Sequence, residues 1–230
     1  MGGGMPIDVR DQAFFRLLQL ASPTLPVGGF SWSQGLEAAV DTGWVGDVVT
    51  AEAWISGLLT HSLGRLDLPV LLRLHSAWSL KDHKRVGDWN DFLYASRTSR
   101  ESRAEDREMG RALARLLMNL GLNKEEILSL EAPTYVALFA LAGVTWHLDD
   151  VTTAGALAWS FVENQVAAAV KLVPLGQSAG QAIMMRLCET LPHVIEAASS
   201  LPDGALGAWA PAVSLLSAMH ENQHTRLFRS

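Results

Sequence analysis

Apolar residues recur at helical spacing along most of this chain, and that pattern restricts the fold more than any other feature. In the stretch "DQAFFRLLQLA", Phe14, Leu17, Leu18 and Ala21 follow the i, i+3, i+4, i+7 spacing of one buried helix face. Strand-like alternation bounded by turns is hard to find. Residues that favour helix starts, such as Asp47, precede several further apolar stretches. We therefore predict an all-α bundle of about ten helices with short connections.

Nothing in the sequence divides this bundle into parts. There is no internal repeat, low-complexity tract or long linker, so we predict a single domain over residues 1–230 with flexible ends at about 1–10 and about 225–230. The longest uncharged run, Ala132 to Leu148, is about 17 residues long, just short of a bilayer span. Charged residues close both of its ends, so we expect a buried helix there and no membrane association.

Composition and charge exclude several classes of function. The 230 residues are 49% hydrophobic, enough to bury a full core. The chain has 18 basic and 24 acidic residues, a net charge of -6, so we expect no general attraction to nucleic acid or to anionic membranes. Cys188 is the only cysteine, which rules out an internal disulfide and the C-x-x-C spacing of zinc ribbons, and this is typical of a cytoplasmic protein.

One short motif matches an enzyme signature. "HENQH", from His220 to His224, is an H-E-x-x-H sequence, which on a helix places both histidines on one face for zinc, with Glu221 as general base. A third ligand would normally come from a helix further on, but only six residues follow His224. No P-loop and no G-x-S-x-G elbow is present. We predict no catalytic residue, no metal site and no cofactor, and we keep a small helical zinc hydrolase as the alternative function.

A series of arginines is spaced so that the guanidinium groups stack along one helix face. The intervals of three and four residues join Arg97, Arg100, Arg103, Arg107, Arg111 and Arg115. Like charges at this spacing repel each other slightly, and the acidic residues alongside can offset that repulsion. Spacing alone leaves two interpretations open: a solvated charged face, and a docking stripe for an acidic partner.

Prolines and glycines interrupt the helical pattern in "SPTLPVGGFSWSQGLE", from Ser22 to Glu37. The prolines end the first helix, and Gly28 and Gly29 permit a tight reversal. We predict that Ser31 and Gln34 form an S-x-x-Q capping box that starts the next helix. A structural joint is enough to explain the pattern.

Lys171 lies in a region that carries few charges. Between Val151 and Met219 charged residues are sparse, so most of this region is expected to be buried in the fold or in an interface. A lysine near a helix C-terminus complements the helix dipole, which gives Lys171 a sufficient structural role. Gly176 and Gly180, four residues apart, are expected to allow a close helix crossing.

Four blocks of the sequence, in order, resemble the signature blocks of the UreF-type urease accessory proteins. They are "LLQLASPTLPVGGFSWSQGLE", "SRTSRESRAEDREMGRAL", "FVENQVAAAVKLVPLGQSAGQ" and "MHENQHTRLFRS". The resemblance implies a non-catalytic, all-helical, usually dimeric protein that forms a complex with a UreD (or UreH) protein and the GTPase UreG. That complex acts on apo-urease and supports nickel insertion coupled to GTP hydrolysis. We therefore expect a urease maturation factor, with these proteins and a second copy of the chain as partners.

The resemblance also marks candidate partner-binding residues. Three lie in the first block and three in the second: Phe30, Trp32, Gln34, Arg100, Arg103 and Arg107. Lys171, in the third block, is expected near the dimer or GTPase-facing surface. The C-terminal tail is expected to be mobile in the free protein and to become ordered on a UreD-type partner through Arg226, Leu227, Phe228 and Arg229.

Two positions depart from the family pattern. His224 stands where tyrosine is usual, so the match of "HENQH" to a zinc motif arises from one substitution. Trp32 stands where tyrosine is common, which keeps an aromatic ring but removes a hydroxyl group. Any role that needs the phenol is therefore in doubt.

Overall fold

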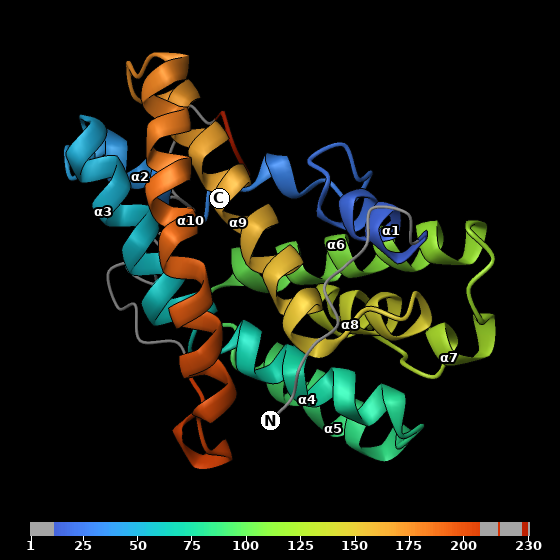
Figure 1. Ribbon diagram of the computed structural model, residues 1–230. Coiled ribbons are helices and arrows are strands. Elements are labelled where there is room, and N and C mark those ends of the chain that lie inside the picture. The colour runs from blue at the N-terminus through green and yellow to red at the C-terminus, as the bar shows by residue number, and fades with distance from the viewer. Residues whose placement is uncertain (1–11, 208–215, 217–226, 230) are drawn as a thin grey trace.

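The computed structural model describes residues 12–207, 216 and 227–229, and this part of the chain contains ten α-helices and no strand (Figure 1). The predicted all-α fold is confirmed. The elements are α1 (Gln12–Ala21), η1 (Gly29–Ser31), α2 (Leu36–Asp41), α3 (Val48–Leu58), η2 (Leu59–Leu63), α4 (Asp67–Ser79), α5 (His83–Ala95), α6 (Arg100–Asn119), α7 (Lys124–Leu128), α8 (Tyr135–Thr145), α9 (Asp150–Leu172), α10 (Gln177–Ser200) and η3 (Asp203–Ala205).

Side-chain caps start several of these helices. The Asp47 side chain accepts a hydrogen bond from the backbone N–H of Thr50, and the backbone N–H of Asp47 donates to the Thr50 hydroxyl. α3 therefore begins with a capping box. Ser99 and Ser102 form the same arrangement at the start of α6. Asp149 caps α9. Polar side chains therefore satisfy backbone groups that the first turn leaves unpaired.

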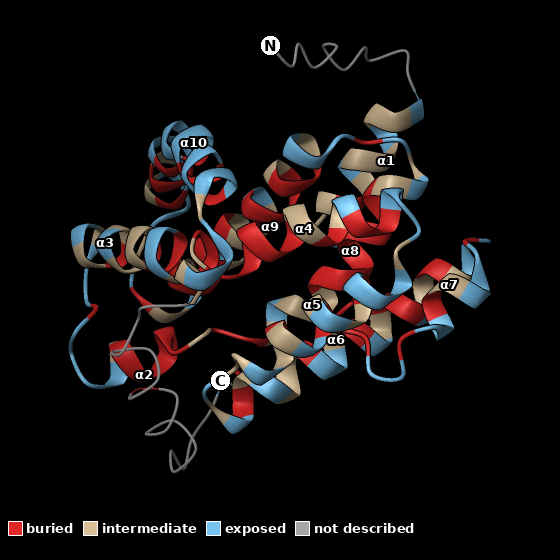
Figure 2. Ribbon diagram, turned by 90° about the horizontal axis from the view of Figure 1, so that it is seen from below, coloured by how far each residue is buried: buried red, intermediate tan, exposed pale blue. Residues whose placement is uncertain are grey.

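The uncharged run forms the central helix α8, as predicted. Most of its residues are buried, and Phe139 is fully enclosed. Helices α4, α6 and α9 pack against it, and the indole N–H of Trp78 donates to the carbonyl of Ala137 at 2.9 Å. Figure 2 shows the buried residues along α8, α4 and the inner side of α9, with exposed residues on the outer sides of α3, α5 and α10. Within the described residues, no helix has the length and apolar character needed to cross a bilayer.

The predicted close crossing involves only one of the two glycines. α9 and α10 pack side by side, and a Cβ added at Gly180 would lie 2.7 Å from Cγ2 of Val170. A larger residue would force the helices apart at this point. Gly176 has open space around its Cα, so it is not part of the crossing.

The joint, residues 22–35, connects α1 to α2. Gly28 adopts a left-handed conformation (φ 79°), which confirms the predicted reversal. The predicted capping box is wrong, because Ser31 ends η1 and α2 starts only after Gly35. Two successive left-handed residues, Gln34 (φ 53°) and Gly35 (φ 83°), turn the chain into α2. Gln34 then points its side chain away from the helix start.

Candidate functional site

The described tail, residues 227–229, lies against the joint and α2. The backbone N–H of Leu227 donates to Oε1 of Glu37 at 2.6 Å, and that of Phe228 donates to Oε2 at 2.9 Å. Glu37 is buried, in the first turn of α2. One carboxylate thus accepts hydrogen bonds from two successive backbone N–H groups. Hydrogen bonds to a carboxylate are charge-assisted and stronger than those between neutral groups. This geometry fixes the direction in which the tail runs.

Two further contacts tie the tail to the rest of the fold. The ring of Phe228 is buried, and Nζ of Lys171 lies 5.9 Å from its centroid, within the range of a cation–π contact. The backbone N–H of Arg229 donates to the carbonyl of Ser31 at 2.8 Å, and its guanidinium lies 5.7 Å from the Trp32 ring.

The sequence predicted a tail that is mobile until a partner binds, whereas its described residues lie against the rest of the chain. The physical reason is the Glu37 carboxylate, which satisfies two tail amides and leaves Phe228 covered. Leu227 is 67% exposed, so it remains available at the surface. Arg226 and the "HENQH" motif, His220 to His224, lie outside the described residues.

Arginines of α6 line a cleft next to the tail. This arginine cleft has a volume of about 450 Å³ and is formed by Tyr94, Arg100, Arg103, Ala104, Arg107, Glu108 and Arg111. Arg103 Nε donates to the carbonyl of Ser99 at 3.3 Å, and the Arg107 guanidinium lies 4.5 Å from the centre of the Tyr94 ring. Glu108 pairs with Arg229 of the tail. Through that pair the cleft and the tail form one continuous surface.

The four arginines of the cleft are exposed. Within the described residues no acidic side chain forms an ion pair with Arg100, Arg103, Arg107 or Arg111. Contacts with Ser99 and Tyr94 nevertheless fix the positions of two of the guanidinium groups. Fixed, planar and unpaired guanidinium groups are suited to bind carboxylates.

Arg97 does not belong to this face, so the predicted six-membered stripe is wrong at its first member. It precedes α6 and its side chain is largely buried, with 2.6 Å to Asp67 and 2.9 Å to Asp106. Burial opposes its charge, yet the two carboxylates raise the pKa of Arg97 above its ordinary value. Asp106 also accepts a hydrogen bond from the backbone N–H of Tyr135 at 2.9 Å. This group of charges holds α4, α6 and α8 together.

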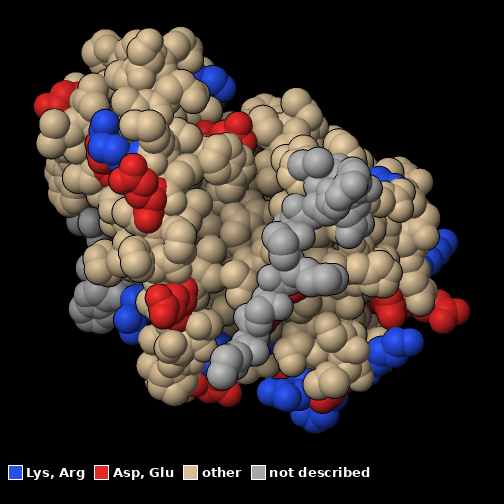
Figure 3. Space-filling view, in the orientation of Figure 1, with Lys and Arg blue, Asp and Glu red and all other residues tan. Residues whose placement is uncertain are grey.

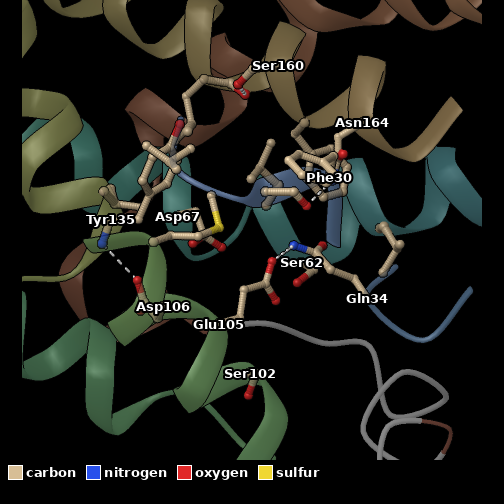
Figure 4. A pocket seen from close by; sticks show the side chains of 18 of the residues that line it. Phe30, Gln34, Ser62, Asp67, Ser102, Glu105, Asp106, Tyr135, Ser160 and Asn164 are labelled. Carbon is tan, nitrogen blue, oxygen red and sulfur yellow. Dashed lines mark hydrogen bonds between the residues drawn. The ribbon is translucent and has the colours of Figure 1, made fainter. Parts of the chain in front are cut away.

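A cavity of about 510 Å³ lies beneath the joint and is lined by residues of η2, α6, α8 and α9 and of the segment that leads into α6. We call it the inner cavity. Figure 4 shows Gln34 and Glu105 pointing toward each other at its edge, where Nε2 of Gln34 donates to Oε1 of Glu105 at 2.9 Å. Burial raises the pKa of Glu105 to about 7, although the bond from Gln34 acts in the opposite direction. Burial also raises the pKa values of Tyr135 and Glu163.

The candidate residues lie in two regions, one formed by the tail and the adjoining arginine cleft, the other by the inner cavity. Trp32, Lys171, Phe228 and Arg229 meet at the tail, next to the cleft that holds Arg100, Arg103 and Arg107. Phe30 and Gln34 line the inner cavity, although the Phe30 ring is also 60% exposed.

Sequence reasoning missed Glu37, Glu105 and Asn164. The side-chain amide of Asn164 donates to the carbonyls of Gly29 and Trp32, which holds the joint onto α9. All three residues lie inside blocks quoted for the resemblance, and that position was the only available signal.

These features define a class before any comparison is made. The chain is an all-α protein with a tail docked on its own surface, an arginine cleft beside that tail and an inner cavity below. Within residues 12–207, 216 and 227–229, no group of three or more His, Cys, Asp or Glu side chains is placed to hold a metal ion.

Comparison with known proteins places the chain in a family. The family model described as UreF matches residues 45–188. The chain is 45% identical over 214 residues to the urease accessory protein UreF of Teredinibacter turnerae, covering 93% of this chain and 97% of that protein. The corresponding protein of Alkalilimnicola ehrlichii is 44% identical over 217 residues, covering 94% and 95% of the two chains. The chain therefore belongs to the UreF family, whose curated members are named as accessory proteins rather than enzymes.

Proposed function

We propose that this protein is a urease maturation factor that acts in the cytoplasm without catalysing a reaction itself. It bridges a UreD or UreH-type protein and a UreG-type GTPase on apo-urease, and it supports GTP-dependent nickel insertion. The observation that carries the proposal is the meeting of the joint, Lys171, the tail and the arginine cleft on one surface. Relatives that align along almost the whole chain carry the name urease accessory protein.

The tail and the joint form the docking site for the UreD-type partner. Arginine side chains contribute strongly to the binding energy of many interfaces, and Arg229 is exposed on this surface. The buried rings of Trp32 and Phe228 hold the tail in the position that presents Arg229 and Leu227 to the partner. Leu227 and Phe30, which are 67% and 60% exposed, add apolar area that a partner can cover. Lys171, next to Phe228, lies at the edge of this surface and faces the dimer or the GTPase.

The arginine cleft binds an acidic segment of a partner. Four like charges repel one another while the cleft is empty, and a bound acidic segment removes that repulsion. Arg103 and Arg107 are already held in place by Ser99 and Tyr94, so binding orders few additional rotamers.

A second copy of the chain docks on the uncharged face. On the side seen in Figure 3, many of the described residues in view are uncharged, with charged groups on the left part and along the lower and right edges. Helices α1 and α9 contact each other and expose Phe15, Leu18 and Trp159, which are 59%, 52% and 40% exposed. Exposed apolar groups of this size are typical of homodimer interfaces.

Charge reversal in the cleft tests the proposal. The double variant Arg100→Glu and Arg107→Glu, co-expressed with the UreD-type and UreG-type proteins and urease, is expected to lose complex formation and urease activation by at least about tenfold. The residual association is expected to weaken less with added salt than that of the unmodified protein. The control is Arg85→Glu with Arg115→Glu, two exposed arginines outside the cleft.

A normal complex and normal urease activity in the cleft variant would overturn the docking role of the cleft. Circular dichroism and the unfolding midpoint of both double variants establish that each keeps its fold. Loss of urease activation in the control pair to the same extent would also count against the cleft, because the effect would then follow net charge alone.

A further inference from the structure

The inner cavity holds more acidic than basic side chains. Its lining includes the carboxyl groups of Asp67, Glu105, Asp106 and Glu163, and Arg97 is the one basic residue among the lining residues. Both aspartates already pair with Arg97, at 2.6 Å and 2.9 Å. Among the described residues, neither Glu105 nor Glu163 forms an ion pair. When Glu105 is ionised, above its raised pKa of about 7, the cavity therefore carries a carboxylate charge with which no basic side chain of the described residues pairs.

The hydrogen bonds of Glu105 are also incomplete. Within the described part of the chain, the amide of Gln34 is the single donor to its side chain, and it reaches Oε1. No donor among the described residues reaches Oε2, which can accept a bond from a bound molecule. Gln34 reaches Glu105 from a left-handed backbone position (φ 53°), a conformation that residues other than glycine adopt at a cost. Strained positions of this kind gather at binding sites, where the surrounding structure holds them.

Apolar side chains form part of the cavity wall, alongside hydroxyl groups such as those of Ser62, Ser102 and Ser160. These apolar lining residues include Leu25, Val27, Phe30, Met109 and Phe161. The volume of about 510 Å³ falls within the range of pockets that bind small molecules. A site with an apolar wall and an unpaired carboxylate accepts a molecule that is apolar at one end and cationic at the other.

We propose that the inner cavity binds a small organic cation, an amidinium, guanidinium or ammonium group carried on a compact apolar body. The cationic group donates to Glu105, and the body packs against Phe30, Met109 and Phe161. This inference does not depend on the proposed function, since it concerns a cavity beneath the docking surface and not the surface itself. Its test uses the isolated chain, so the two can fail separately.

Calorimetric titration with benzamidine tests the site, with benzamide as the neutral probe and benzoate as the anionic probe of similar shape. The measurement is made above pH 7, where Glu105, with a pKa of about 7, is ionised. We expect saturable binding of benzamidine and at least about tenfold weaker binding of the other two probes. Glu105→Gln, which keeps the bond to Gln34, is expected to weaken benzamidine by a similar factor. Glu125→Gln, an exposed change of the same kind on α7, serves as the control and is expected to bind normally.

A second readout does not depend on any variant. Carbon-13 NMR of the glutamate carboxyl groups follows the titration of Glu105 with and without saturating benzamidine. A bound cation stabilises the carboxylate, so the pKa of Glu105 is expected to fall when benzamidine is present. Absence of saturable benzamidine binding, equal binding of benzoate, unchanged affinity in Glu105→Gln, or an unchanged Glu105 titration would each overturn the proposal.

Discussion

Arginines that are neighbours in the sequence occupy opposite environments in this protein. Arg97 is enclosed between Asp67 and Asp106, whereas Arg100, Arg103, Arg107 and Arg111 face solvent and form no ion pair with a carboxylate of the described residues. The buried arginine joins three helices, and the exposed arginines form a positively charged surface that an acidic partner would neutralise. Regular spacing therefore identifies a helix face, while the position of the counter-ions decides whether an arginine supports the fold or binding.

The largest change in stability is expected when the buried arginine, Arg97, is replaced. Arg97→Ala leaves Asp67 and Asp106 close together and unpaired, and removal of one partner from a buried ion pair typically costs about 3 to 5 kcal/mol. We expect the free energy of unfolding in urea to fall by that amount. Arg111→Ala, on the exposed side, is expected to change it by less than about 0.5 kcal/mol. Equal losses of stability in the two variants would show that Arg97 does not support the fold more than Arg111 does.

The next effect concerns Glu105, a carboxyl group of the same cavity that has no ion-pair partner. Its pKa is raised from 4.5 to about 7, so the native state holds a proton that the unfolded state releases between these values. The free energy of unfolding is therefore expected to fall as pH rises from 4.5 to 7, by about 2 kcal/mol once solvent screening of this partly exposed group is allowed for.

Glu105→Gln is expected to remove this component of the pH dependence. Urea unfolding across the same pH range measures it in both proteins. The ionisable groups around Glu105 are Asp67 on α4, Arg97 before α6, Asp106 on α6, Tyr135 on α8 and Glu163 on α9. A pH dependence that is identical in the two proteins would assign the effect to one of these groups instead.

A smaller effect is expected at Glu37, a buried carboxylate that accepts hydrogen bonds from two backbone amides of the tail. Glu37→Gln retains one acceptor oxygen but places an NH2 group against one of the two tail amides, at a cost of about 1 to 2 kcal/mol. We expect the amide of Phe228 to exchange its hydrogen faster, while the amides of α8 keep their protection. Unchanged exchange at Phe228 would mean that Glu37 does not hold the tail.

Much of the fold could be predicted from the sequence because its signals are local. The capping box of Asp47 and Thr50, the buried run of α8 and the close packing at Gly180 each follow from residues near one another in the chain. The site could not be predicted in the same way. Arg97 meets Asp67 across 30 positions, and Glu37 meets Leu227 across 190, so no spacing rule connects them.

Local signals also failed where two conformations were equally compatible with the residues. Ser31 and Gln34 have the right types and spacing for a capping box, but Gln34 and Gly35 adopt left-handed conformations and delay the helix to Leu36. The energy that favours this choice comes from distant contacts. Gln34 reaches Glu105 on α6, and Asn164 on α9 holds the preceding carbonyls.

The smallest change in stability is expected when exposed arginines of the cleft are replaced. Arg103→Gln together with Arg107→Gln removes two like charges from the cleft, and the relief of repulsion is expected to raise the free energy of unfolding by a few tenths of a kcal/mol, about 0.2 to 0.5. Urea unfolding at low ionic strength measures this change, and added salt is expected to abolish it. A loss of stability above about 1 kcal/mol would show that these arginines support the fold, as Arg97 does.

The most direct test of the docking surface is deletion of residues 225–230, with stability and partner binding measured on the same protein. The loss of the Phe228 contacts is expected to lower the free energy of unfolding by about 1 to 3 kcal/mol. Binding to the UreD-type partner, measured by calorimetry, is expected to weaken at least about a hundredfold, because the tail supplies the anchors of that interface. A truncated protein that remains folded and binds this partner with unchanged affinity would contradict the account.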